Sequence, residues 1–189
     1  MGTVRSHPLC PRGSRSRPRD PRQVQAQRVF HRRDLCGGEK GGSGVGKTKR
    51  GKGTKLMAVA DGSSLPVAIH ATSASPHEVT LVEDTLAQRH TRTTPKTIIG
   101  DLAYDSDGLD RRLAQRRITL IAPHRSNRTR PATQDGRPLR RYRRRWKIER
   151  LFSWLQNYRR VLTRYEYYLA NYLGFAQLAC ILILLKKGF

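Results

Sequence analysis

The distribution of apolar residues divides this chain near residue 56. Before that point apolar side chains are scattered among Arg, Pro, Gly and Ser, whereas after it they recur with the periods of strands and helices. Residues 56–60 predict a strand, the Asp-Gly-Ser-Ser of residues 61–64 predicts a turn, and residues 65–71 predict the partner strand of a hairpin. A folded domain therefore begins close to this hairpin.

Alternating helices and strands are expected after the hairpin. Ser75, Pro76 and Glu78 are typical of the N-cap, first and third positions of a helix, which we expect to run to about residue 88. Residues 97–100 predict a short apolar strand that ends at Asp101. Further along, the pattern predicts a helix over residues 106–116, a strand over residues 119–122 and a basic loop over residues 123–138.

A helix beginning at residue 139 carries aromatic and acidic residues together. Tyr142, Trp146, Glu149 and Phe152 recur at spacings of three or four, which places them on one helical face. We expect Trp146 to pack in the core rather than to contact a ligand.

The last predicted helix covers residues 165–186. It is apolar, but Asn171 and Gln177 interrupt the apolar run, which is short for a membrane span, so a buried core helix is favoured. The order of elements is hairpin, helix, strand, helix, strand and helix. We therefore predict an α/β fold in which helices flank a mixed sheet.

The charge balance indicates a polyanionic partner. The 189 residues include 38 Lys+Arg and 14 Asp+Glu, a net charge of +24, and the planar fork of arginine suits phosphate groups. A non-catalytic basic DNA-binding protein is one reading of this charge. Cys10, Cys36 and Cys180 are isolated and match neither a zinc motif nor a disulfide framework, and residues 1–20 lack the apolar run of a signal peptide. We therefore expect a cytoplasmic protein without a membrane segment.

Residues 1–45 predict a disordered basic segment, and residues 46–189 predict the folded domain. Residues 1–55 contain 15 Lys+Arg and 3 Asp+Glu among clustered Pro, Gly and Ser, a composition that cannot bury a core. Residues 41–48 fit the pattern G-x-x-x-x-G-K-[ST]. A phosphate-binding loop needs a strand before it and a helix after it. Neither is predicted here, so we interpret the match as coincidence.

Two carboxylates are the candidate chemistry. Asp101 ends an apolar strand, and Glu149 lies on a helix rich in arginine and aromatic residues. Two carboxylates that face one cleft can hold a divalent metal ion, and nearby arginines can hold phosphates. The alternative is a buried carboxylate paired with arginine, and the residues by themselves leave both readings open.

These segments resemble the DDE transposases of bacterial insertion sequences, close to the insertion-sequence-five branch. Residues 99–106 are similar to the segment around that family's second catalytic aspartate. Tyr142, Arg145 and Glu149 match the signature Y-x-x-R-x-x-x-E-x-x-x-x-x-x-K, with Gln156 in place of the lysine. The likeness covers roughly residues 46–185.

The resemblance implies a ribonuclease-H-like fold and metal-dependent DNA strand cleavage and transfer. Asp101 and Glu149 would be the catalytic residues and would ligate two Mg²⁺ (or Mn²⁺) ions. The implied partner is double-stranded DNA at the terminal inverted repeats of the element, bound by the protein as a homodimer. The residues expected to contact DNA are Tyr142, Arg144, Arg145, Lys147 and Arg150.

The first catalytic aspartate of that family has no clear counterpart. It belongs on the central first strand, before residue 46, where no strand is predicted. Asp34 is the nearby candidate, and Asp61 lies in the hairpin turn, where the family has a non-catalytic Asp-Gly. Residues 31–39 can be encoded by codons that, read one base later, give Ile-Asp-Gly-Thr-Phe-Ala-Ala-Glu. We therefore predict a missing or degraded first strand, translation of about residues 1–40 out of frame, and an inactive or impaired transposase unless Asp34 substitutes.

Overall fold

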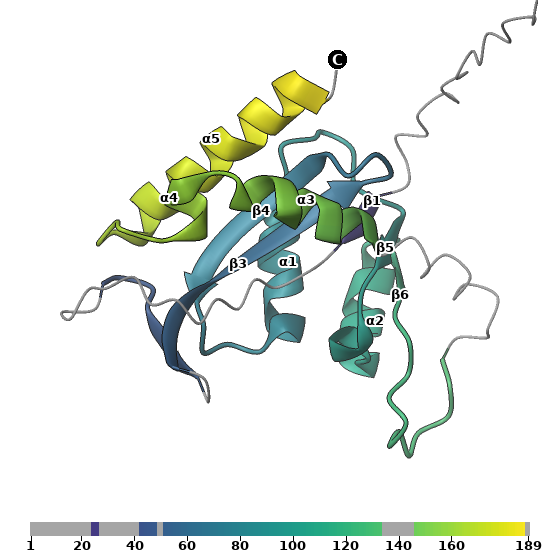
Figure 1. Cartoon of the computed structure of the whole chain (residues 1–189). Helices are drawn as coiled ribbons and strands as arrows, with labels where there is room; N and C mark the ends of the chain where they lie inside the picture. Colours follow the sequence, from purple (N-terminus) through teal and green to yellow (C-terminus); the bar gives the residue numbers. More distant parts are fainter. Residues whose placement is uncertain (1–23, 27–41, 49–50, 134–145, 188–189) are drawn as a thin grey trace, which may run out of the picture.

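A computed structural model of the chain describes residues 24–26, 42–48, 51–133 and 146–187. Within these residues, helices cover both faces of a sheet, as the sequence predicts (Figure 1). The helical elements are η1 (Glu78–Leu81), α1 (Val82–Ala87), η2 (Leu102–Tyr104), α2 (Asp107–Gln115), α3 (Trp146–Gln156), α4 (Arg159–Leu162) and α5 (Leu169–Lys187).

The predicted hairpin consists of β3 (Gly51–Asp61) and β4 (Pro66–Ser73), which pair antiparallel. Its turn is stabilised by the carboxylate of Asp61, which accepts hydrogen bonds from the amides of Ser63 at 2.7 Å and Leu65 at 2.9 Å. Both strands extend beyond the predicted bounds. Asp61 thus has a structural role in the turn, because its side chain satisfies backbone donors there.

A short strand joins the hairpin to a parallel pair. β1 (Val24–Ala26) pairs antiparallel with the end of β3, with Gln25 opposite Ala60. It also contacts β5 (Thr97–Ile99), which pairs in parallel with β6 (Thr119–Ile121). β1 therefore lies next to β3 and β5, in the central place expected for the first strand, and its described part covers three residues.

The position of β1 departs from the disorder expected for residues 1–45. Residues 23–27 read Gln-Val-Gln-Ala-Gln, an uncharged alternating stretch inside a basic segment, and alternation is the pattern of a strand. Residues 42–45 also contact the folded part of the chain. The rest of the expected disordered segment lies outside the described residues, so that part stays a prediction.

The sheet is buried on both faces, which explains the continuous apolar run in β3. Met57 and Val59 pack in a core cluster with residues of α1 and α2, whereas Leu56, Ala58 and Ala60 pack in a second cluster with residues of α3 and α5. Side chains alternate between the faces of a strand, so every position in this run is buried.

Two predicted helix starts are wrong. The helix expected from Ser75 begins at Glu78, because the side chain of His77 accepts a hydrogen bond from the amide of Val79 and so caps it. The helix expected from residue 165 begins at Leu169, and a separate short helix, α4, ends before it at Leu162.

α5 is long and apolar enough to cross a membrane by length and composition alone. One side of it is buried against the sheet, whereas Leu178, Ile181 and Leu185 on the other side are exposed, so the expectation of a buried core helix holds for one face only. The buried residues are Tyr172, Ala176, Ala179, Cys180 and Ile183.

Candidate functional site

Asp101 follows β5 after one residue, Gly100, at the carboxyl end of the parallel pair. Its carboxylate Oδ1 accepts a hydrogen bond from the amide of Ala103 at 2.9 Å and caps η2. The side chain is half-buried. This cap orients Asp101 because an N-cap side chain is held against the first turn of its helix.

A second acid, Glu78, interacts both with Asp101 and with a buried lysine. Lys55 is almost fully buried in β3, and its Nζ donates to the carbonyl of Pro76 at 2.5 Å. Burial raises the pKa of Glu78, the Asp101 carboxylate raises it further, and Lys55 acts against both. These contacts are not predicted from the sequence, although a lysine at the edge of an apolar strand is a signal of a buried polar contact.

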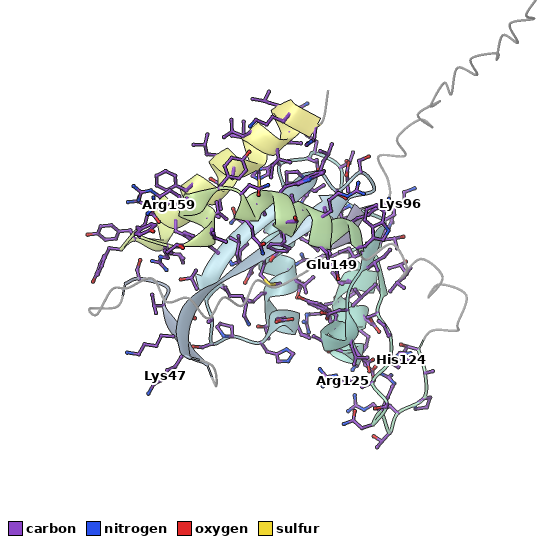
Figure 2. The ribbon with its side chains drawn as sticks, viewed as in Figure 1. Lys47, Lys96, His124, Arg125, Glu149 and Arg159 are labelled. Carbon is purple, nitrogen blue, oxygen red and sulfur yellow. The ribbon has the colours of Figure 1, made fainter. Side chains whose placement is uncertain are left out.

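Glu149 lies in the first turn of α3, next to the fully buried Ile148. α3 packs across β3 and also contacts β1. Figure 2 shows Glu149 on the part of α3 near β1, distant from Arg159. Asp101 and Glu149 therefore belong to the strand and the helix that contact β1 from two sides.

β1 itself contributes no carboxylate, because its residues are Val24, Gln25 and Ala26. Within the described part of the chain, no group of three or more His, Cys, Asp or Glu residues is arranged to hold a metal ion. Asp34 lies outside the described residues. The pairing of Asp101 with Glu149 around a metal ion stays a prediction.

The residues expected to contact DNA fall into two groups. Tyr142, Arg144 and Arg145 lie outside the described residues. Lys147 donates from Nζ to the carbonyl of Gly62 and so ties the start of α3 to the hairpin turn. Their contacts with DNA stay predictions.

Arg150 is the exposed member of the predicted set. Its guanidinium lies 4.1 Å from the ring centroid of Trp146, a cation–π contact. Trp146 is 45% exposed, so the expectation that it packs in the core is wrong. Gln156, which stands in place of the signature lysine, is exposed at the end of α3.

Asp105 fastens the basic loop after β6 to the segment of Asp101. The side chain of Asp105 is 5% exposed, and its carboxylate lies 2.8 Å from His124 Nδ1 and accepts from the Arg125 amide at 2.8 Å. Arg128 Nη1 also donates to it at 2.7 Å. Burial acts to raise the pKa of Asp105, but these three partners together lower it below its usual range.

The same loop contacts η2 directly, because the Arg125 guanidinium donates to the carbonyls of Leu102 and Ala103. Arg128 also binds Asp107 at 2.6 Å. Figure 2 shows His124 and Arg125 at the end of the molecule beyond β6. The sequence predicted this loop as basic but not these pairs.

The glycine-rich segment is no phosphate-binding loop. β2 (Gly46–Thr48) pairs antiparallel with the start of β3, so a hairpin follows the motif instead of a helix. A Cβ at Gly46 would lie 2.5 Å from Ser75 Oγ, and one at Gly42 would lie 2.6 Å from the Tyr167 carbonyl oxygen. These glycines permit close backbone packing, and the interpretation of the match as coincidence is confirmed.

Comparison with known proteins places these features in a family. Residues 17–184 match the sequence model of a protein family, the transposase DDE domain. The chain belongs to this DDE transposase family. The match begins ahead of residue 46 and so includes β1 as well as Asp101 and Glu149.

Two curated insertion-sequence transposases are similar to the chain. It is 29% identical over 150 residues to a putative transposase of IS402 from Burkholderia cepacia, covering 75% of this chain and 67% of that protein. It is 34% identical over 139 residues to a putative transposase of IS6501 from Brucella ovis, covering 70% of this chain and 98% of that protein.

The fold also has a solved relative. The piggyBac transposase, in a synaptic complex with hairpin DNA, aligns with a TM-score of 0.51 and 13% identity over 85% of this chain. The chain spans 45% of that protein's length. The ribonuclease-H-like fold implied by the sequence is confirmed.

Proposed function

We propose that this chain is the transposase of a bacterial insertion sequence, that it binds double-stranded DNA at the element's terminal inverted repeats, and that its strand cleavage and transfer are impaired. One observation carries the impairment. The strand between β3 and β5 reads Val24-Gln25-Ala26, while the strand and helix that bring Asp101 and Glu149 flank it. The three described residues of this central strand therefore include no acid, and residues 27–41, which carry Asp34, lie outside the described part of the chain.

The chemistry explains why one acid matters. Carboxylate oxygens such as those of Asp101 and Glu149 suit Mg²⁺ or Mn²⁺, which would activate the attacking water or 3′-hydroxyl and stabilise the leaving oxygen at a phosphodiester. Two acids leave the pair of ions incompletely held. Lys55 and Glu78 help to set the charge near Asp101, since burial lowers the pKa of Lys55 and raises that of Glu78.

The proposal extends to the surroundings of this function. We expect the protein to act in the cytoplasm at the nucleoid and to bind the two ends of an element as a homodimer. Residues 46–189 would form the catalytic domain, with β1 donated from upstream. The family match to residues 17–184 supports the upstream contribution.

The test is metal-dependent cleavage of an oligonucleotide that carries the element's end. We expect the chain as it stands to cleave little in Mg²⁺ or Mn²⁺. A chain whose first 40 residues are translated in the alternative frame should regain cleavage, and Asp101→Asn or Glu149→Gln in that chain should abolish it. Strong cleavage by the original chain that Asp34→Ala abolishes would identify Asp34 as the first ligand and contradict the reading-frame hypothesis.

A non-catalytic basic DNA-binding protein is the alternative function, supported by the net charge of +24. Both proposals predict that duplex binding weakens steeply as salt rises, because neutralised phosphates release counterions. Charge reversal at Arg144 and Arg145 should weaken binding to all sequences alike, and binding that ignores salt would contradict both. Only the transposase proposal predicts that the restored chain cleaves DNA.

A further inference from the structure

Three tyrosines project into solvent where α4 leads into α5. Tyr165 is 56% exposed, Tyr167 59% and Tyr168 62%. The rings of Tyr167 and Tyr168 contact each other edge to face, with centroids 5.2 Å apart. Large aromatic side chains gathered on a surface commonly mark a binding site, because each leaves apolar area in water. We call Arg159, Arg160, Tyr165, Tyr167 and Tyr168 the α4–α5 corner.

The backbone beneath these tyrosines is held by a buried arginine. The side chain of Arg164 donates from Nε to the Glu166 carbonyl at 2.8 Å and from Nη2 to the Tyr167 carbonyl at 2.8 Å. Nη2 also donates to the Ser43 carbonyl at 2.6 Å. Arg164 is only 4% exposed. A buried charge is costly unless it is hydrogen-bonded, so Arg164 keeps these carbonyls in place. The aromatic side chains of the same segment stay exposed to solvent.

A second contact, from the glycine-rich segment, fixes the start of α5. The amide of Ser43 donates to the Tyr167 carbonyl at 3.0 Å, and the Ser43 hydroxyl accepts from the amide of Leu169 at 2.8 Å. Ser43 thereby satisfies one of the free donors at the start of the helix. The tyrosines are thus presented from a preorganised backbone, which lowers the entropic cost of binding.

Arginines accompany the exposed rings. The guanidinium of Arg160 lies 5.4 Å from the centroid of Tyr165, and that of Arg159 lies 5.8 Å from it. Glu166 is the nearby acid, but its side chain is 6% exposed and binds Arg160 at 2.8 Å. The outward charge of the corner is therefore positive.

The positive charge of the α4–α5 corner indicates which kind of partner binds there. A second copy of this chain that placed the same corner against this one would bring Arg159 and Arg160 against their own counterparts, so like charges oppose pairing through this surface. A nucleic acid strand supplies both phosphates for the arginines and bases for the tyrosines. Bases in a duplex are stacked on each other and do not offer their faces, whereas unpaired bases stack on aromatic side chains whatever the sequence.

We propose that the α4–α5 corner binds the unpaired bases of a DNA strand. The corner lies away from Glu149. The part of α3 from Glu149 to Gln156 is about 10 Å long, and the corner begins beyond the end of α3. Figure 2 shows Arg159 at one end of the molecule and Glu149 near β1 and β5. This surface rests on the proposed DNA function but is distinct from the predicted contacts near Glu149.

The test compares single-stranded and duplex oligonucleotides of equal length by fluorescence anisotropy, using the full chain. Tyr167→Ala and Tyr168→Ala should each weaken single-strand binding by about 5- to 150-fold, the range found when a stacking aromatic is removed. Tyr167→Phe and Tyr168→Phe should restore it, since the ring is kept. Arg159→Gln should reduce the slope of log affinity against log salt on the single strand by about 0.7.

Duplex binding separates this proposal from the proposed function. We expect the tyrosine variants to bind duplex DNA like the parent, and Leu185→Ala, an exposed apolar change on α5, to leave both substrates unaffected. Normal duplex binding with unchanged single-strand binding in the tyrosine variants would overturn the corner while leaving the transposase proposal intact. Concentration-dependent dimers that the alanine variants abolish would show a protein interface and also overturn it. Circular dichroism of each variant serves as the control that it is folded.

Discussion

Replacing Arg164 by methionine should destabilise the protein strongly. Its guanidinium binds the carbonyls of Ser43, Gly44, Glu166 and Tyr167 and the hydroxyl of Thr54. Methionine keeps most of the side-chain volume but removes the donor to the Ser43 and Glu166 carbonyls, whereas the Tyr167 carbonyl keeps the Ser43 amide and the Gly44 carbonyl keeps the Thr54 hydroxyl. The partners of Arg164 are neutral, so the charge is satisfied by dipoles rather than by a carboxylate.

The magnitude follows from those contacts. A buried acceptor that loses its donor costs about 1–3 kcal/mol, and three of the contacts are 2.6–2.8 Å long. Relief of the desolvation of Arg164 offsets part of the sum, which leaves a loss of about 3–5 kcal/mol. For a chain of this size that corresponds to a fall in Tm of about 6–20 °C.

Urea and thermal unfolding of the full chain, followed by circular dichroism and tryptophan fluorescence, measure this loss. Arg116→Ala is the matched control, because Arg116 is exposed and pairs with Glu83 at 3.1 Å on the surface. Such a pair contributes less than about 1 kcal/mol. If Arg164→Met and Arg116→Ala lose the same stability, the buried guanidinium does not hold the corner in place and the reasoning is wrong.

Three further predictions rest on single positions. Gly44→Val should cost about 1–3 kcal/mol in urea unfolding, because Gly44 has φ +72° and a Cβ would lie 2.6 Å from Leu169 Cδ2; an unchanged midpoint would contradict this. The lowered folded pKa of Asp105 contributes stability above its unfolded pKa of about 3.9, which is lost as pH falls through the folded value. An acid titration of Asp105→Asn should therefore fall less steeply than that of the parent, and equal curves would exclude this role. Burial raises the pKa of Cys180 to about 12, so thiol reagents at pH 8 should label it only after unfolding; rapid labelling of the native chain would contradict its burial.

The local elements of the fold were readable from the sequence. The hairpin, β5, β6 and α2 appear where turn residues and apolar periods predict them, because these signals lie within the segments themselves. The helix start was misplaced at Ser75, since several polar residues in a row can cap a helix and only the fold decides that His77 does so.

Long-range contacts were not readable. Arg164 and Ser43 lie far apart along the chain, and no local sequence pattern around either residue predicts that they pair. The ion pair between Asp105 and Arg128 could not be predicted from the sequence either, because charged residues in a basic loop are usually solvated. Of the candidate site, the sequence predicted where Asp101 and Glu149 lie in the order of elements, but not the buried Lys55 or Glu78 beside Asp101.

The fold and the metal chemistry place different requirements on the first strand, β1. The sheet requires from β1 a backbone that pairs with β3, and Val24, Gln25 and Ala26 supply that pairing opposite residues 59–61. Two-metal phosphoryl transfer instead requires a carboxylate at one position, which no other property of a strand replaces. The family match extends through β1, and the described residues of β1 supply no third acid for the chemistry proposed for Asp101 and Glu149. The proposed function therefore predicts a chain that stays folded and basic enough to bind DNA while cutting it poorly.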